Sequence, residues 1–175
     1  MDLVVGHDRT EHGDDALRAA ARLARSSDAG LDLGVVVVLT QQDLDATGEL
    51  AADQKRSVAI ERAFPAMWRR IDEVLLGEGI DSEQLSLDVV VRVAAVHLVR
   101  SQERIALELL GVMRDHGATR IVLGREGRPG GVAEYLLAHG AIEALPDLPE
   151  GVRVVAVDPS KLELDDPERV RSGPK

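Results

Sequence analysis

Short apolar runs alternate with amphipathic stretches along most of this 175-residue chain. The apolar runs predict five strands covered on both faces, at residues 3–5, 31–39, 85–96, 121–123 and 152–157. Apolar residues recurring at helical spacing predict helices from about residue 14, over 51–76, from 101 to 117 and over 132–145. Strands alternating with helices indicate an open parallel sheet of the α/β class, with helices on both faces.

Three stretches depart from this pattern. Residues 40–48 are polar and predict a surface loop, and Pro65 is expected to kink or divide the long helix. Residues 159–175 are charged, contain proline and have no apolar period, so we expect a flexible C-terminal tail. The chain before it, residues 1–158, is expected to form one domain.

The amino-acid composition argues against several classes of function. The formal net charge of −10 opposes general attraction to nucleic acids or anionic membranes. The single Phe, Trp and Tyr leave aliphatic residues to build the core and argue against stacking platforms for nucleic acid. Cysteine is absent, which removes thiolate catalysis and zinc-thiolate sites. The chain begins without a basic leader and its longest apolar run is too short for a bilayer, so a cytoplasmic location is expected.

A glycine-rich turn follows the fourth predicted strand, from Gly124 through Gly127 to Gly131. Such a turn can present backbone N–H groups to a phosphate at the start of a helix, although glycines also occur there for steric reasons alone. Asp8 closes the first strand, where it can contact a ligand or simply cap the following turn. Ligands of doubly wound sheets bind where the winding direction reverses, which would bring Asp8 and the glycine turn to one crevice.

Two stretches resemble the universal stress protein family. Residues 3–12, LVVGHDRTEH, resemble the family's first strand and the turn after it, and residues 116–128, HGATRIVLGREGR, resemble its glycine-rich stretch. With the last strand, the resemblance covers roughly residues 2–158. It implies a Rossmann-like, adenine nucleotide alpha hydrolase-like fold with a five-stranded parallel sheet of order 3-2-1-4-5. It also implies a homodimer paired through the last strand, here through Val152, Val154, Val155 and Val157.

The resemblance also implies a nucleotide site, which this chain matches in part. The matching positions lie at the first-strand carboxylate, the end of the second strand and the glycine turn: Asp8, Val38, Leu123, Gly124, Gly127, Arg128 and Gly130. Where ATP-binding members have a later glycine followed by Ser or Thr, this chain has Leu137 and Ala138, and Gly140 would serve only with three residues inserted. Arg9 stands where the family has glycine. ATP or AMP is therefore a possible ligand, with magnesium only if a nucleotide binds, but binding in the usual family manner is not expected.

The remaining candidates have plain structural explanations. The five histidines contain no i, i+4 pair, so no metal site is expected, and no serine lies in a nucleophile elbow. Arg125 and Arg128 can neutralise phosphate or pair with Glu126. An aromatic and aliphatic stripe in the long helix is expected to face the core, with Arg69 and Arg70 as its solvated edge.

The leading hypothesis is a universal stress protein-like binding or regulatory module, homodimeric and not a conventional enzyme, with a protein partner as a further possibility. The alternative is an ATP- or AMP-binding member with a divergent phosphate loop and slow nucleotide hydrolysis. A metabolic enzyme on a similar sheet is a third class, because fold does not determine function.

Overall fold

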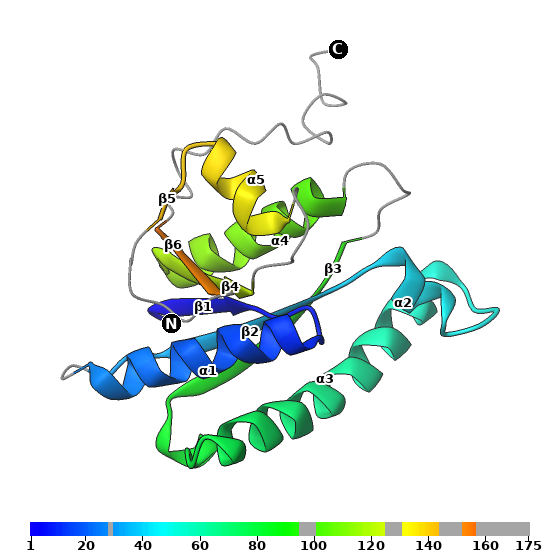
Figure 1. Ribbon diagram of the computed structural model, residues 1–175. Coiled ribbons are helices and arrows are strands. Elements are labelled where there is room, and N and C mark those ends of the chain that lie inside the picture. Colours follow the sequence, from blue (N-terminus) through cyan, green and yellow to red (C-terminus); the bar gives the residue numbers. More distant parts are fainter. Residues whose placement is uncertain (28–29, 95–100, 125–130, 144–151, 157–175) are drawn as a thin grey trace.

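A central sheet lies between two layers of helices (Figure 1). The computed structural model describes residues 1–27, 30–94, 101–124, 131–143 and 152–156. Six strands form the sheet: β1 Leu3–Gly6, β2 Leu33–Leu39, β3 Leu87–Val93, β4 Arg120–Gly124, β5 Ile142–Glu143 and β6 Val152–Ala156. Their order is β3-β2-β1-β4-β6-β5. The α/β class and the predicted order of the first four strands and the last one are confirmed.

The last strand corrects the expectation of a wholly parallel sheet. β6 runs antiparallel to β4, and the short strand β5 pairs with its other side. After helix α5 (Val132–Ala138) the chain returns to the amino-terminal edge of the sheet as β5, and only residues 144–151 separate β5 from β6. A connection of this length suits an antiparallel pair, whereas a parallel pair needs a longer crossover. β6 is therefore not the edge strand of the sheet, which the predicted pairing of two copies through this strand requires.

The helices follow the sequence pattern closely in the first half of the chain. Helix α1 spans Glu11–Ser26, α3 spans Ala52–Gly77 and α4 spans Ser101–His116, with a short 3-10 turn η1 at Ser82–Gln84. Helix α3 runs through Pro65 as one helix, so the proline does not divide it. The predicted loop at 40–48 contains a short helix, α2 (Gln41–Asp45), which begins where the Thr40 backbone N–H donates to Asp43 Oδ2 at 2.7 Å.

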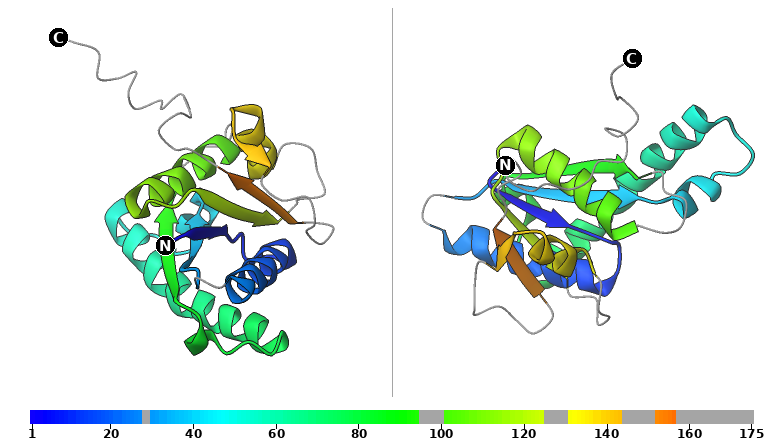
Figure 2. Two further views of the ribbon diagram at one scale, coloured as in Figure 1. Left: turned by 90° about the vertical axis from the view of Figure 1, so that its left-hand side faces the viewer. Right: turned by 90° about the horizontal axis from the view of Figure 1, so that it is seen from above.

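Helix α5 is shorter than predicted. It ends at Ala138 instead of Leu145, because Gly140 takes a left-handed φ of 104° just beyond it and β5 follows. Figures 1 and 2 place α2 and the first turns of α3 beyond the carboxyl end of β2.

The core has two parts, one on each face of the sheet. Val5 packs with α1 and α3 on one face, while its neighbour Val4 packs with α4 and α5 on the other. Val154 and Val155 of β6 divide between the two faces in the same way. This alternation is the period of two expected of strands covered on both sides. The strand ends are consequently fixed by packing on both faces.

Several predictions concern residues outside those that the structure describes. They are Gly127, Arg128 and Gly130 of the glycine turn, Val157 of the last strand and the tail at 159–175. The described residues reach Ala156 within a single sheet, and the domain boundary at 158 stays a prediction. Among the described helices, none is long and apolar enough to span a membrane.

Candidate functional site

A small crevice opens where β1, β2 and β4 end. Gly6, the last residue of β1, pairs with Val36 and with Leu123, so β2 and β4 continue past the end of β1 on either side of it. The crevice has a volume of about 90 Å³. Its walls come from the three strand ends and from α1, α4 and α5: Gly6, His7, Asp8, Gly13, Val36, Val38, Ile105, Leu109, Leu123, Gly124, Val132 and Ala133. Most of these side chains are aliphatic, so the crevice suits an apolar ring better than a charged group.

The crevice brings four of the predicted ligand residues together. Asp8, Val38, Leu123 and Gly124 all line it, although they come from the turn after β1, from β2 and from β4. Gly140 does not line it and lies beyond the other end of α5. Four residues predicted to contact a nucleotide therefore line one crevice, while Gly140, the predicted second phosphate contact, lies elsewhere.

Asp8 caps the turn between β1 and α1. Its Oδ1 accepts hydrogen bonds from the Thr10 backbone N–H at 3.0 Å and from the Thr10 hydroxyl at 2.7 Å. Burial alone would raise the pKa of Asp8, but these hydrogen bonds outweigh it and hold the pKa below its ordinary value of 3.8. The carboxylate is thus ionised at neutral pH and oriented by its own turn.

Arg9 occupies a backbone conformation that favours glycine. Its φ is 65°, the left-handed region, at the position where the universal stress protein family has glycine. The guanidinium reaches α2, where Nη2 lies 2.7 Å from Asp43 Oδ1. Arg9 therefore has a backbone conformation that glycine adopts more readily, and an ion pair joins the turn to the segment after β2.

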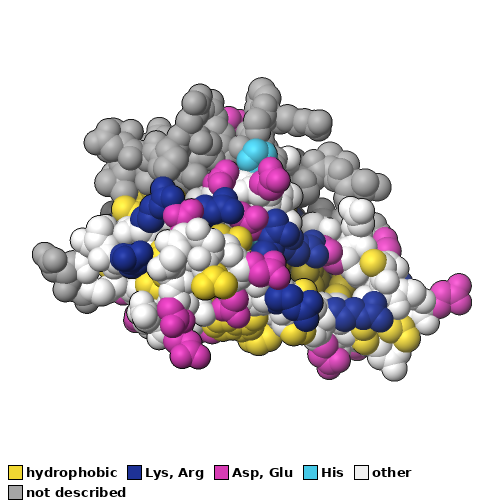
Figure 3. Space-filling view, turned by 60° about the horizontal axis from the view of Figure 1, so that its bottom comes forward, with side chains coloured by type: hydrophobic (Ala, Val, Ile, Leu, Met, Phe, Trp, Pro, Cys, Tyr) yellow, Lys and Arg dark blue, Asp and Glu magenta, His cyan; other side chains and the backbone are white. Residues whose placement is uncertain are grey.

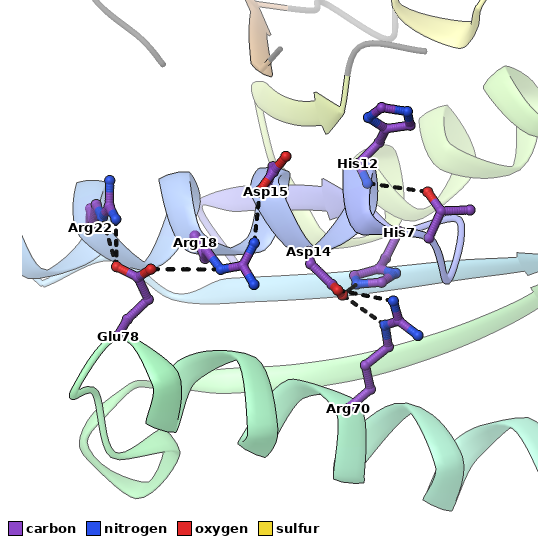
Figure 4. A network of polar contacts seen from close by, with 9 residues as sticks. His7, His12, Asp14, Asp15, Arg18, Arg22, Arg70 and Glu78 are labelled. Carbon is purple, nitrogen blue, oxygen red and sulfur yellow. Dashed lines mark hydrogen bonds and ion pairs between the residues drawn. The ribbon is translucent and has the colours of Figure 1, made fainter. Parts of the chain in front are cut away.

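His7 is buried, and both of its ring nitrogens make hydrogen bonds within the protein; Figure 4 shows the one to Asp14. Nδ1 accepts from the Arg9 backbone N–H at 2.9 Å, so the proton lies on Nε2, which donates to Asp14 Oδ1 at 3.1 Å. Asp14 also receives two hydrogen bonds from Arg70, at 2.7 and 2.9 Å. Burial lowers the pKa of His7 below 6.5 more than the Asp14 carboxylate raises it. His7 is a neutral structural bridge and is not placed to take a proton from a ligand.

Two glycines allow α1 to approach the strand ends. A Cβ on Gly13 would lie 2.7 Å from Asp8 Oδ1 and 2.7 Å from His7 Nδ1. A Cβ on Gly124 would lie 2.1 Å from the His12 carbonyl oxygen, which belongs to the backbone of α1. Gly124 is therefore needed for helix packing, and its presence at the crevice is not by itself evidence of phosphate binding.

The other predicted residues lie in the core or at its margin. Leu137 is partly buried against the α4 and α5 side of the core and does not line the crevice. Val154 and Val155 are fully buried within one chain, so their side chains are not available to a second copy. Arg70 was expected on a solvated edge, but its guanidinium pairs with Asp14.

Sequence reasoning missed His7, Gly13 and Ile105 as crevice residues. Gly13 could have been recognised from the sequence, because a glycine in the first turn of a helix indicates that another segment packs closely against that turn. Nothing in the sequence indicates the role of His7, since its partner Asp14 is fixed in turn by Arg70, which lies 56 residues beyond Asp14. Among the described residues, no group of three metal-ligating side chains is present.

Comparison with known proteins yields one distant likeness. No family model matches the chain, and no curated protein matches it. A solved structure of the hypothetical protein MJ0577, a test case of structural genomics, is similar over 74% of this chain and 77% of that chain, with 15% identity and a TM-score of 0.49. A likeness this distant does not place the chain in a family, so the universal stress protein resemblance stays a prediction.

Proposed function

We propose that this protein is a non-catalytic binding and regulatory module of the universal stress protein type, which holds the ring of an adenosine-bearing ligand in the crevice. The observation that carries the proposal is the convergence of Asp8, Val38 and Leu123 on one apolar recess where the strands end. Asp8 offers an ionised oxygen to a hydroxyl or amino group, and the aliphatic walls offer contact to a ring.

The size of the crevice limits what it holds. At about 90 Å³ it is smaller than the roughly 150 Å³ cavity that encloses benzene, so a ring enters by its edge. The described lining contains no lysine or arginine, and Gly140 is not part of it. The phosphates therefore contribute little to affinity, in contrast to the usual family site.

A catalytic role is disfavoured by the same residues. The histidine of the crevice has both nitrogens engaged, and Asp8 is held by Thr10 with a lowered pKa. A general base needs a free position and a pKa near the working pH. The described lining has no other titratable side chain, so we propose binding without turnover.

The alternative function is ATP or AMP binding through a divergent phosphate loop, with slow hydrolysis. The observation in its favour is that residues predicted to contact adenosine line one crevice, together with the left-handed backbone at Arg9. This alternative differs from the leading proposal in one measurable respect. ATP would bind much more tightly than adenosine, and magnesium would matter, because the loop would contact the phosphates.

The test is calorimetric titration with adenosine, AMP and ATP, with and without magnesium. We expect dissociation constants between about 10 µM and 1 mM, or about −7 to −4 kcal/mol, that differ little among the three ligands. Ile105→Phe fills the crevice and should abolish binding, whereas Ile60→Phe, at a partly buried position on α3, should not. No heat with any ligand, or equal binding by both variants, would refute the proposal. A strong preference for magnesium-ATP would support the alternative.

We also propose a homodimer formed at the β5–β6 edge of the sheet. β5 covers only the last two residues of β6, and its Ile142 is 70% exposed. An exposed apolar residue on an edge strand favours pairing with a second copy, and lysine there opposes it. Sedimentation at tens of micromolar should therefore show a dimer that Ile142→Lys weakens. Leu76→Lys, at an equally exposed leucine on α3, should leave it intact; a monomer at this concentration would refute the dimer.

A further inference from the structure

A second, larger hollow lies on the opposite side of the strand ends from the crevice. It is lined by the end of β2, helix α2 and the middle of α3, from residue 59 to residue 73, and has a volume of about 450 Å³. Four alanines leave this space unfilled: Ala46, Ala59, Ala63 and Ala66. Figure 3 shows this face, with Lys and Arg side chains gathered around a hydrophobic depression. The volume is in the range of sites that bind small molecules.

Arginine dominates the charge of this hollow. Its lining contains four arginines and two acidic residues, a formal charge of +2 in a chain of −10: Arg9, Arg62, Arg69 and Arg70 against Asp43 and Glu73. The acidic composition of the whole chain makes this local excess notable, because cations in an acidic protein are expected to find carboxylate partners. The hollow is therefore a place of opposite sign to the molecule around it.

The four arginines fall into two pairs of different kinds. Arg9 and Arg70 are oriented by the carboxylates of Asp43 and Asp14. Arg62 and Arg69, two turns apart on α3, are exposed and form no ion pair with any residue that the structure describes. The first pair is pre-positioned, and the second pair has its guanidinium donors open to a ligand.

We propose that this hollow binds a small molecule that carries at least two negative charges on phosphate or carboxylate groups. Arg62 and Arg69 hold the anionic end, because the planar guanidinium matches both groups with paired N–H donors. The apolar part of the ligand lies on the floor formed by Leu39 and Met67. Arg9 and Arg70 stay paired with their own carboxylates, so the charge that attracts the ligand comes from Arg62 and Arg69.

This site is separate from the crevice, and its test is independent of the proposed function. His7 lines the crevice and Arg70 lines the hollow, with Asp14 between them. The lining residues of the two sites do not overlap. A variant that fills the crevice should therefore leave the hollow unchanged.

The experiment is calorimetric titration of the full chain with pyrophosphate and with citrate at constant ionic strength. We expect a dissociation constant below about 1 mM for at least one probe. Arg62→Gln/Arg69→Gln should weaken binding about tenfold or more, since each charged hydrogen bond is worth more than a neutral one. Tighter pyrophosphate binding indicates a phosphate ligand, and tighter citrate binding indicates a carboxylate ligand.

The matched control removes two arginines from other exposed positions, as Arg25→Gln/Arg56→Gln. It lowers the net charge by the same amount, and we expect less than about a twofold change in affinity. All four substituted arginines are exposed, so both variants should unfold at the wild-type temperature. Absence of binding by both probes, equal weakening in the two double variants, or loss of binding in Ile105→Phe would each overturn the proposal.

Discussion

The crevice and the hollow lie at the same end of one sheet but differ in size and chemistry. The crevice has a volume of about 90 Å³, aliphatic walls and one carboxylate that its own turn satisfies. The hollow has a volume of about 450 Å³ and four arginines. The ends of parallel strands thus provide recesses on both faces, while the charge of each recess depends on the helices that cover it.

This difference separates two properties that nucleotide sites usually combine. The crevice has the apolar surface that suits a ring, and the hollow has the cations that suit anionic groups. The His7–Asp14–Arg70 network lies between the two recesses. His7 lines the crevice, and Arg70 lines the hollow. The two recesses are therefore best understood as different sites that this hydrogen-bond network separates.

The largest expected effect comes from removing the central residue of the His7–Asp14–Arg70 network. Asp14→Ala removes the partner of a buried imidazole N–H and of the Arg70 guanidinium, and should lower the free energy of unfolding by about 2–4 kcal/mol. Asp15→Ala, which breaks a partly exposed pair with Arg18, should cost about 0.5 kcal/mol or less. Urea unfolding followed by the fluorescence of the single tryptophan measures both. Equal losses of unfolding free energy in the two variants would mean that the network does not stabilise the fold.

The next effect tests the close approach of α1 to the crevice. Gly124→Ala places a Cβ against the His12 carbonyl, which only a movement of α1 can relieve, and should destabilise the protein by about 1–3 kcal/mol. The control is Gly111→Ala in α4, where nothing lies within 4 Å of the added Cβ and a helical alanine should stabilise by about 0.5–1 kcal/mol. Opposite signs in thermal unfolding are expected, and a stabilising Gly124→Ala would contradict the packing role.

A smaller effect tests the turn that joins the crevice to the hollow. Arg9→Ala and Arg9→Gly both remove the ion pair with Asp43, but only glycine relieves the left-handed φ of 65°. The glycine variant should be the more stable of the two by about 1 kcal/mol. At an ordinary exposed position the order would be reversed. If alanine proves the more stable, the backbone strain assigned to Arg9 is absent.

The smallest expected effect is a pH dependence from the crevice side of the network. The pKa of His7 is lowered from 6.5 in the folded protein, so the unfolded chain binds the proton more readily. His7 therefore contributes stability that is present above about pH 6.5 and is lost as the pH falls toward its folded pKa. Asp8 and Asp43, whose pKa values are lowered from 3.8, lose their contribution only in more acidic solution.

His7→Asn should flatten the dependence of unfolding free energy on pH between about 7.5 and 5.5. Subtracting the curve of the variant from that of the wild type isolates His7, because the other histidines are common to both. An unchanged slope would show that His7 titrates alike in the folded and unfolded chains.

Much of the fold was predictable from local patterns. The order of the principal strands and helices α1, α3 and α4 followed from apolar runs and helical periodicity, because packing on both sheet faces imposes those patterns. The antiparallel β6 and the two-residue β5 were not predictable, since a short apolar strand reads the same in either direction. The helix α2 was hidden in a polar segment whose only signal was Thr40 followed by Asp43.

The candidate site was predictable in position but not in chemistry. Asp8, Val38 and Gly124 meet because β1 lies between β2 and β4 and the three parallel strands end at the same edge of the sheet. The hydrogen bonds between Asp14 of α1 and Arg70 of α3 join residues that are 56 positions apart in the sequence. In the sequence alone, the arginines of α3 resemble the solvated face of a helix, because nothing indicates that α2 lies opposite them. Contacts between distant segments leave no periodic signal in a single sequence.

The most direct test of two separate sites is a crossed calorimetric titration of the wild type, Ile105→Phe and Arg62→Gln/Arg69→Gln with adenosine, which carries no negative charge, and with pyrophosphate. We expect adenosine binding to be lost only in Ile105→Phe and pyrophosphate binding to be weakened only in the double arginine variant. Loss of both ligands in the same variant would contradict this account and would mean that the two recesses form a single nucleotide site.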